Sequence, residues 1–247
     1  MERTHSLQKA THAILGAEYD LGKHLTLNVE GYYKWFNQLT NMNRNKLYDD
    51  NPDNFEIPDV AKKDFIIETG EAFGVDAVFK YNLEKTYIWF VYSLGKVNRW
   101  DGVQSYAPVF DRRHNINLVA TQKFGKDDVW EINLRWNFGS GLPFTQTQGY
   151  YHLIDYSQGI GTDITTNNSN DLGIIYADLN NGRLPAYHRL DMAIKRKFII
   201  SDRSEFNFTA SCTNMYSRNN IFYVDRITNE KVYQLPILPS LGISWTF

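Results

Sequence analysis

VWEINLRWNF, residues 129–138, is the stretch of this sequence that decides the fold. Every second residue is large and apolar: Trp130, Ile132, Leu134, Trp136 and Phe138. The residues between them are mostly polar: Val129, Glu131, Asn133, Arg135 and Asn137. Successive side chains of a β-strand point to opposite sides, so this segment predicts a strand with one apolar face and one largely polar face. The apolar face would either pack on a core or contact lipid.

The same period of two recurs along the chain in segments of about 9–14 residues. It is clear in 24–35, 115–121, 205–213 and 240–247, and less regular in 11–21, 66–82 and 188–199. Segment 86–98 is apolar on both faces. Together with 129–138, these segments predict nine strands.

The connections between the predicted strands alternate in length. Short polar turns are predicted at 22–23, 82–85, 125–128 and 201–204, and long irregular loops at 37–65, 100–112, 139–187 and 217–239. This alternation is typical of outer-membrane barrels, whose long loops lie outside the cell. A soluble β-sandwich is the alternative, but soluble domains rarely contain such long loops. The predicted fold class is therefore all-β, an antiparallel transmembrane β-barrel segment.

Composition excludes several other classes of protein. No stretch of the 247 residues approaches the roughly 18 apolar residues of a membrane helix. The net charge of −2, without a basic stripe, argues against nucleic acid as a partner. The single cysteine, Cys212, excludes a disulfide framework. No serine or cysteine has a recognisable catalytic partner motif, so we predict neither an enzyme nor a cofactor.

The two ends of the sequence carry different signals. The first residues lack the apolar core of a signal peptide, so we expect Met1 to lie inside a longer protein. The ending SLGISWTF, 240–247, resembles the assembly signal of bacterial outer-membrane barrels, carried here by Ser240, Gly242, Trp245 and Phe247. A terminal strand with a free edge can pair with the assembly machinery and then with the first barrel strand. This places the C-terminus in the periplasm.

Several motifs in order resemble one known family. They are FDRRHNINL (110–118), WNFGSGLPFTQ (136–146), RLPAYHRLD (183–191), NNIFYVD (219–225) and QLPILPS (234–240). This pattern is similar to the C-terminal half of TonB-dependent receptors of the Bacteroidetes type. The resemblance implies that residues 1–247 are one part of a barrel of about 22 strands, without the plug domain and the N-terminal barrel strands.

The resemblance also implies a function and partners. It implies a receptor of the Gram-negative outer membrane that takes part in energy-coupled uptake of a scarce ligand: a siderophore, vitamin, glycan or peptide. The partners would be outer-membrane lipid, the barrel assembly machinery, the ligand and a TonB-type energy coupler acting through the missing plug. The alternative is a passive outer-membrane pore, or a structural barrel fragment without transport activity of its own.

Two polar motifs begin strands that run inward from the predicted outer loops. They contain Asp111, Arg112, Arg113 and His114, and His188, Arg189 and Asp191. One interpretation is a polar cluster in the lumen that binds ligand or braces the plug. The other is a network of Arg–Asp ion pairs that fixes strand register, because paired guanidinium and carboxylate groups are geometrically demanding.

Other motifs indicate less specific roles. Asp49, Asp50, Asp53 and Glu56 lack the spacing of a calcium loop, so a solvated acidic loop is favoured. No metal site is predicted for His114, His152 and His188, and 159–161 lacks the setting of a phosphate loop. Loop 139–187 is rich in residues suited to contact with sugars, peptides or small chelates, which makes it a candidate outer binding surface; the alternative is a solvated surface loop. These residues are Gln146, Gln148, Tyr150, Tyr151, Tyr156, Asn167, Asn168, Asn170 and Tyr176.

Overall fold

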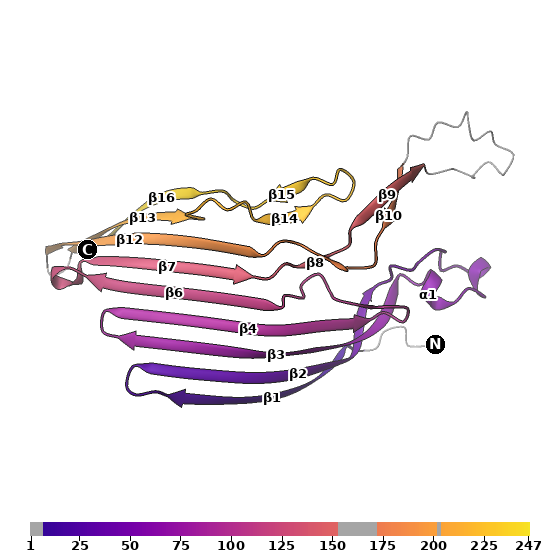
Figure 1. Cartoon of the computed structure of the whole chain (residues 1–247), viewed down its shortest axis with the longest axis horizontal. Helices are drawn as coiled ribbons and strands as arrows, with labels where there is room; N and C mark the ends of the chain where they lie inside the picture. Colours follow the sequence, from indigo (N-terminus) through magenta and orange to yellow (C-terminus); the bar gives the residue numbers. More distant parts are fainter. Residues whose placement is uncertain (1–6, 153–171, 202–203) are drawn as a thin grey trace.

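The computed structural model of the chain describes residues 7–152, 172–201 and 204–247. In these residues nine long strands form one antiparallel sheet in chain order (Figure 1). They are β1 (Lys9–Asp20), β2 (Leu25–Met42), β3 (Phe65–Leu83), β4 (Thr86–Trp100), β6 (His114–Phe124), β7 (Trp130–Gly139), β12 (Tyr187–Ser201), β13 (Ser204–Thr213) and β16 (Leu238–Thr246). The predicted all-β fold and its nine strands are confirmed.

Strand register turns the period of two into two continuous faces. Trp136 of β7 lies opposite Leu118 of β6 and Leu190 of β12, within one apolar row. The next row contains Asn137, opposite Asn117 and Arg189. Directly paired residues share a side of the sheet. We call the side of Asn137 the polar face and the side of Trp136 the apolar face.

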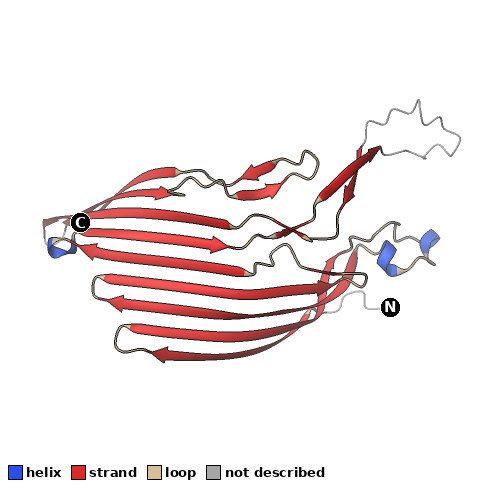
Figure 2. Ribbon diagram, viewed as in Figure 1, coloured by secondary structure: helices blue, strands red, loops and turns tan. Residues whose placement is uncertain are grey.

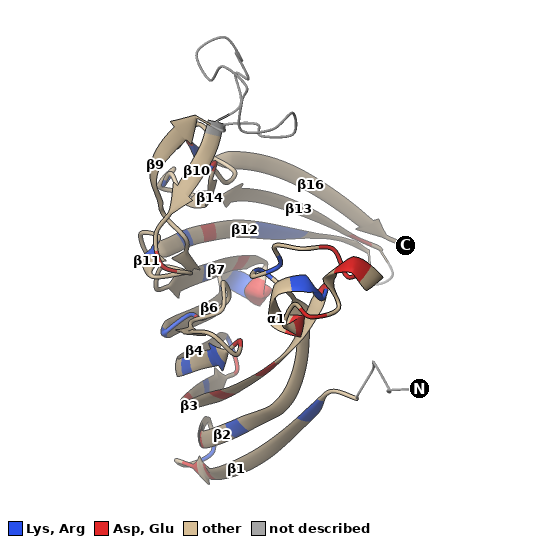
Figure 3. Cartoon of the chain, turned by 90° about the vertical axis from the view of Figure 1, so that its right-hand side faces the viewer, with Lys and Arg blue, Asp and Glu red and all other residues tan. Residues whose placement is uncertain are grey.

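The sheet is strongly curved, so it has a hollow side and an outer side (Figure 3). The loop between β2 and β3, which contains the short helix α1 (Asp59–Lys62), folds over the hollow. Arg44 of this loop contacts Glu68, which shares the polar face with Gly70 and Asp76 along β3. The apolar face therefore lies on the outer side of the curve.

No second layer of the described structure covers the apolar face. Among the described residues, the buried apolar side chains are Ala72, Tyr106 and two prolines, Pro108 and Pro143, whereas large residues such as Leu15, Ile243 and Trp245 are exposed. A soluble sandwich would bury this face against a second sheet. An exposed apolar patch of such extent instead marks an interaction surface. No helix in the described part of the chain is long and apolar enough to cross a membrane.

All long connections lie at one end of the sheet and all short turns at the other (Figure 2). The short turn before β7 contains η2 (Lys126–Asp128). The long loops carry η1 (Pro52–Asn54), α1 and β5 (Ser105–Tyr106), and three small strand pairs. The pairs are β8 (Pro143–Phe144) with β11 (Gly182–Arg183), β9 (Thr147–His152) with β10 (Leu172–Tyr176), and β14 (Ile221–Val224) with β15 (Lys231–Tyr233).

The strands extend further into the loops than the sequence predicts. β2 continues to Met42 because a register shift between Phe36 and Leu39 allows its pairing with β3 to resume. At the two edges, β1 pairs only with β2, and β16 pairs only with β13. Every residue of these edge strands is exposed. The described sheet is thus an open, curved wall.

Candidate functional site

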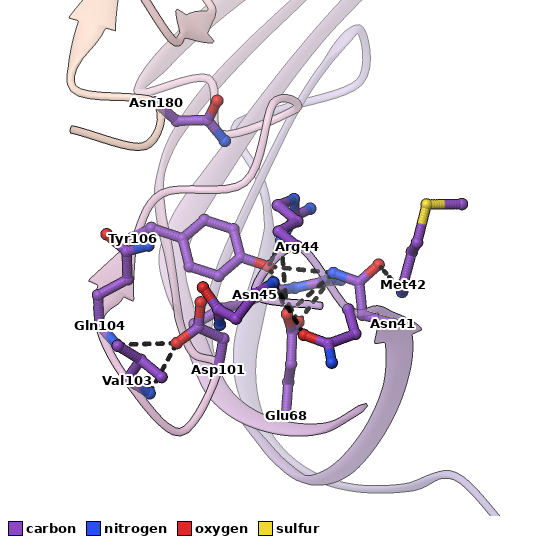
Figure 4. Close-up of polar contacts among 12 residues, drawn as sticks. Asn41, Met42, Arg44, Asn45, Glu68, Asp101, Val103, Gln104, Tyr106 and Asn180 are labelled. Carbon is purple, nitrogen blue, oxygen red and sulfur yellow. Dashed lines mark hydrogen bonds and ion pairs between the residues drawn. The ribbon is translucent and has the colours of Figure 1, made fainter. Parts of the chain in front are cut away.

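A fully buried carboxylate organises the loop end of β2, β3 and β4 (Figure 4). Glu68 accepts hydrogen bonds from the Tyr106 hydroxyl, at 2.9 and 3.0 Å, and from the Asn41 side-chain amide at 3.0 Å. Nη1 of Arg44 lies 3.7 Å from Glu68 Oε1, and Nη1 of Arg99 lies 3.5 Å from Oε2. Two cations and two polar donors therefore compensate the cost of burying this charge.

The register shift in β2 explains how Asn41 reaches Glu68. After the shift, Leu39 lies opposite Glu68, so Asn41 falls on the polar face of the sheet. A bulge of this kind reverses which side chains point to a given side of a strand. Sequence reasoning missed Glu68, because its partners come from distant segments and no local pattern joins them.

A second buried carboxylate, Asp111, lies beside the part of β4 that pairs with neither β5 nor β6. β5 ends at Tyr106 and β6 begins at His114, so neither strand supplies an acceptor to the Val97 amide. The Asp111 carboxylate accepts that N–H bond at 2.8 Å and thereby replaces a missing backbone carbonyl. Arg113 Nε, at 3.1 Å, and Arg183 Nη2, at 2.5 Å, hold the same carboxylate.

The second predicted polar motif is organised separately. Arg189 donates twice to one Asp191 oxygen, at 2.9 and 3.1 Å, and the other oxygen accepts the Asn214 amide at 2.9 Å. Within the described ranges, no ion pair joins Asp111 or Arg113 to Arg189 or Asp191. The structure therefore forms two local clusters rather than one.

The two motif histidines lie on the apolar face. His114 is opposite Leu94, and His188 is opposite Phe138. Nδ1 of His114 is 2.9 Å from the Tyr92 hydroxyl, and Nδ1 of His188 is 2.7 Å from the Tyr216 hydroxyl. These histidines thus lie across the sheet from Arg189 and Asp191. Aromatic and polar side chains at a strand end suit a lipid–water interface.

Arg112 lies on the polar face, above Gly139. A Cβ atom at position 139 would overlap the Arg112 guanidinium, so glycine provides the space in which this side chain lies flat on the wall. The guanidinium carbon is 5.8 Å from the centroid of the Tyr187 ring, and Tyr187 is paired with Gly139. Arg112 thus contacts an aromatic ring instead of a carboxylate.

Buried asparagines hold the long loops in place, and the sequence contains no local signal for them. Asn214, fully buried, donates to the carbonyls of Arg218 and Leu235 at 3.0 and 3.1 Å. Asn180 donates to the carbonyl of Ala107 at 2.9 Å. These amides satisfy backbone groups that have no strand partner.

The predicted outer binding surface is partly described. Its β9–β10 hairpin is joined to the β14–β15 loop by a 2.6 Å hydrogen bond from the Tyr150 hydroxyl to the Ile227 carbonyl. Arg226 lies over the ring of Tyr176, at 5.9 Å from its centroid. The predicted contacts Tyr156, Asn167, Asn168 and Asn170, and the segment 159–161, lie outside the described residues.

A polar cavity of about 590 Å³ opens beside these loops. It lies between the end of β4, segment 104–107 and segment 178–183. Its lining includes Lys96, Asn98, Gln104, Asp178, Asn181 and Arg183. Such a mixture of amides and charges suits a small polar ligand.

The acidic loop is organised by lysines. Lys63 Nζ is 2.9 Å from Asp50, and this hydrogen bond lowers the pKa of the Asp50 carboxyl. Lys46 Nζ is 3.8 Å from Asp49 and 2.7 Å from Asp64. The described part of the chain contains no group of three or more potential metal-ligating side chains, including at His114, His152 and His188.

The predicted assembly signal lies in β16, the last strand of the described sheet, and ends at Phe247 directly after it. Ser240 Oγ is 2.7 Å from Ser211 Oγ, and Trp245 Nε1 donates to Ser204 Oγ at 2.9 Å. Gly242 lies opposite Thr209 of β13. Phe247 is 92% exposed. The free edge of β16 can thus accept a further strand.

Comparison with known proteins places the fold. No protein-family model and no curated protein matches the sequence. The ferripyoverdine receptor of the Pseudomonas aeruginosa outer membrane, bound to ferripyoverdine, is similar over 96% of this chain, with a TM-score of 0.58 and 11% identity. The P. aeruginosa receptor FpvA bound to heterologous pyoverdines gives a TM-score of 0.63 over 97% of the chain, also at 11% identity.

The ferric citrate transporter FecA, in its unliganded form, gives a TM-score of 0.58 over 96% of the chain at 16% identity. These neighbours are TonB-dependent outer-membrane receptors, and at such identities the likeness concerns the fold. The chain spans 27% of the two pyoverdine receptor chains and 31% of the FecA chain. It therefore has the fold of part of a receptor barrel.

Proposed function

We propose that this chain forms part of the barrel wall of a TonB-dependent outer-membrane receptor and takes part in energy-coupled uptake of a scarce ligand. One observation carries this proposal. The sheet has an apolar outer face, a polar hollow face and all its long loops at one end, and receptor barrels match it over 96–97% of the chain. A membrane barrel wall has its two faces and its long loops in that arrangement.

The proposed orientation follows from the loops. The long loops, with the Glu68 and Asp111 clusters, lie outside the cell, and the short turns and Phe247 lie in the periplasm. Ser240, Gly242, Trp245 and Phe247 then present the free strand edge to the assembly machinery. Residues 1–247 would be the C-terminal portion of a Bacteroidetes-type receptor. The TonB-type coupler would then act through a plug outside these residues.

The two edges of the sheet support a larger barrel. Unpaired backbone groups are costly in lipid, where water cannot replace a lost partner. β1 and β16 each have one edge without a partner among the described strands. Further strands of the same receptor, about 13 for a barrel of about 22, would pair with both edges and close the wall.

Cysteine labelling tests the orientation. In a Cys212→Ser background, Leu47→Cys places a thiol in an exposed outer loop and Lys126→Cys places one in a short turn. A membrane-impermeant maleimide should label the Leu47→Cys variant in intact cells. The Lys126→Cys variant should react only after the outer membrane is permeabilised. The opposite pattern would contradict the proposed topology.

Uptake tests the activity and separates it from a passive pore. A strain lacking the gene should lose growth on one defined iron, vitamin, glycan or peptide source. The wild-type gene should restore growth, and a protonophore should abolish uptake of that nutrient. Uptake that continues after the proton gradient is lost would support a passive pore instead.

A further inference from the structure

A groove crosses the apolar face of β1 to β4, on the outer side of the sheet. It has a volume of about 680 Å³. Two neighbouring rows of directly paired residues line it: Leu15, Gly31, Val75 and Leu94, and, nearer the loops, Ala13, Tyr33, Phe73 and Lys96. The rings of Tyr33 and Phe73 stack, with centroids 5.7 Å apart, and form its wall on the loop side. Apart from Lys96, the two rows contain no charged residue.

Gly31 forms the floor of this groove, although neither its backbone nor its neighbours require a glycine. A Cβ atom at Gly74 or Gly95 would overlap the hydroxyl of Tyr32, which lies on the polar face. At Gly31 the nearest atom to such a Cβ would be the Leu15 carbonyl oxygen, at 3.9 Å, which is an ordinary contact. The φ angle of Gly31 is not positive, and its pairing with β1 and β3 is regular. A glycine that neither bends nor bulges a strand is typical of a place where a ligand approaches the backbone.

The groove meets the polar cavity of about 590 Å³ at two cations, because Lys96 and Arg113 line both. The Arg113 carbonyl accepts the N–H of Gly95 at 3.0 Å, which places Arg113 next to Lys96. Lys96 stands on the apolar face, opposite Phe73. A lysine on a lipid-facing surface lays its stem along the apolar side chains and directs its ammonium to a polar partner. The apolar groove and the polar cavity thus form one amphipathic site.

The polar cavity offers groups for both a phosphate and a sugar. Lys96 and Arg113 can donate to phosphate oxygens. The amides of Asn98, Gln104 and Asn181 can exchange hydrogen bonds with hydroxyl groups. Two carboxylates close to the cations already have partners, since Asp111 is bound by Arg113 and Arg183, and Glu71 accepts the Tyr33 hydroxyl. Asp178 is the one carboxylate among the described residues that line the cavity, and it can accept from a sugar hydroxyl.

We propose that this site binds one phosphorylated glycolipid of the outer leaflet. An acyl chain lies over Gly31, the phosphate lies between Lys96 and Arg113, and the sugar occupies the polar cavity. The site rests on the orientation in the proposed function, with the apolar face in the membrane and the loop end outside the cell. A lipid is the occupant because the proposed plug fills the hollow side and further strands pair with the edges of the sheet, so that neither covers this face of β2 to β4.

Native mass spectrometry of the full, delipidated receptor in a mild detergent tests the site. The probe is monophosphoryl lipid A, and the comparison lipids are lipid A without phosphate and phosphatidylglycerol. We expect one molecule of the probe to bind saturably. Lipid A without phosphate should bind at least about tenfold more weakly, because it loses its contacts with two cations. Phosphatidylglycerol should also bind more weakly, because it lacks the sugar that the polar cavity fits.

Two substitutions remove separate parts of the site, each with a matched control. Lys96→Gln should weaken binding of the probe about tenfold, and Lys96→Arg should restore it, because the phosphate needs the charge. Gly31→Leu fills the groove where a side chain has room, so it should weaken binding about threefold or more. Lys34→Gln, on the polar face, and Ala120→Leu, on the apolar face of β6, should both bind like the wild type. Heat-dependent gel mobility should show that every variant forms a folded barrel.

Several results would overturn the glycolipid site. They are equal binding of the three lipids, unchanged binding in Lys96→Gln or Gly31→Leu, or an equal loss in the two controls. If the receptor binds no lipid A while energy-dependent uptake persists, the site is wrong and the proposed function stands. If lipid A binds as expected but uptake needs no energy, the site stands and the proposed transport function fails.

Discussion

Replacing Asp111 should lower the stability of the barrel's loop end more than replacing any single charged residue on its surface. The carboxylate is fully buried and accepts the Val97 amide at 2.8 Å, Arg113 at 3.1 Å and Arg183 at 2.5 Å. Asp111→Ala leaves a buried N–H without an acceptor, and both arginines lose their shared anion. Asp111→Asn keeps an oxygen for Val97 and loses only the charge, so it separates the two effects.

The loss of unfolding free energy follows from how deeply each partner of Asp111 is buried. An unsatisfied buried N–H costs about 1–3 kcal/mol. The two arginine side chains are 33% and 35% exposed, so water can replace part of what they lose. After this screening, each ion pair contributes about 0.5 kcal/mol. We therefore expect a destabilisation of about 2–4 kcal/mol for Asp111→Ala, and about half of that for Asp111→Asn.

Guanidinium unfolding of the full receptor in lipid vesicles, followed by tryptophan fluorescence, measures these differences. Arg183→Ala, alone and combined with Asp111→Ala, completes a double-mutant cycle whose coupling should be about 0.5–1 kcal/mol. The reasoning is refuted if Asp111→Ala unfolds within about 0.5 kcal/mol of the wild type, the range of ordinary surface substitutions. It is also refuted if Asp111→Asn is as costly as Asp111→Ala, because the Val97 acceptor would then be irrelevant.

Four further outcomes test other parts of the structure. Glu68→Ala should destabilise the barrel by about 2 kcal/mol in the same unfolding assay, because the Tyr106 hydroxyl loses its buried acceptor, whereas the 40% exposed Arg44 can turn to water. Gly139→Val should destabilise the barrel in that assay by about 1–3 kcal/mol, because the Arg112 guanidinium occupies the space that a side chain at position 139 would need. Deleting 245–247 should prevent surface exposure, measured by protease access in whole cells, because the assembly edge is lost. Backbone hydrogen bonds from Thr228 and Ile227 lower the pKa of Asp225. The ionised carboxylate therefore stabilises the loop above its unfolded pKa of about 3.9, and this stabilisation disappears as the pH falls through the lower folded pKa. Hydrogen exchange of the loop amides should show the loss at low pH. The Asp225→Asn variant should show no such pH dependence.

The charged contacts show why part of the candidate site was beyond sequence reasoning. The motif at Asp111 was recognisable because Arg113 lies two residues away, but Arg183 is 72 residues further along the chain. Glu68 lies in a less regular strand, and its partner Tyr106 is 38 residues away. The placement of Asn41 depends on a register shift that the alternation of side chains does not reveal.

The histidines show a different limit. His114 and His188 each lie one residue from a member of a polar motif, which suggested that all of them share one environment. In a strand, neighbouring residues point to opposite sides, so His188 lies on the apolar face and Arg189 on the polar face. The alternation of side chains within each motif thus already predicts that the histidines and the charged residues next to them lie on opposite faces.

By itself, the sequence determined the nine strands, the two faces and the alternation of short turns with long loops. These are local properties, because the pleat of a strand assigns each side chain to a side, and turn residues mark where a strand ends. The tertiary structure alone decided which charges are paired and which are left free. Asp191 pairs with Arg189 and accepts the Asn214 backbone N–H, whereas Arg135, which lies opposite Asp191, forms no ion pair with a described residue. Such pairing depends on which strands lie side by side and in what register, and both are set by the assembled sheet.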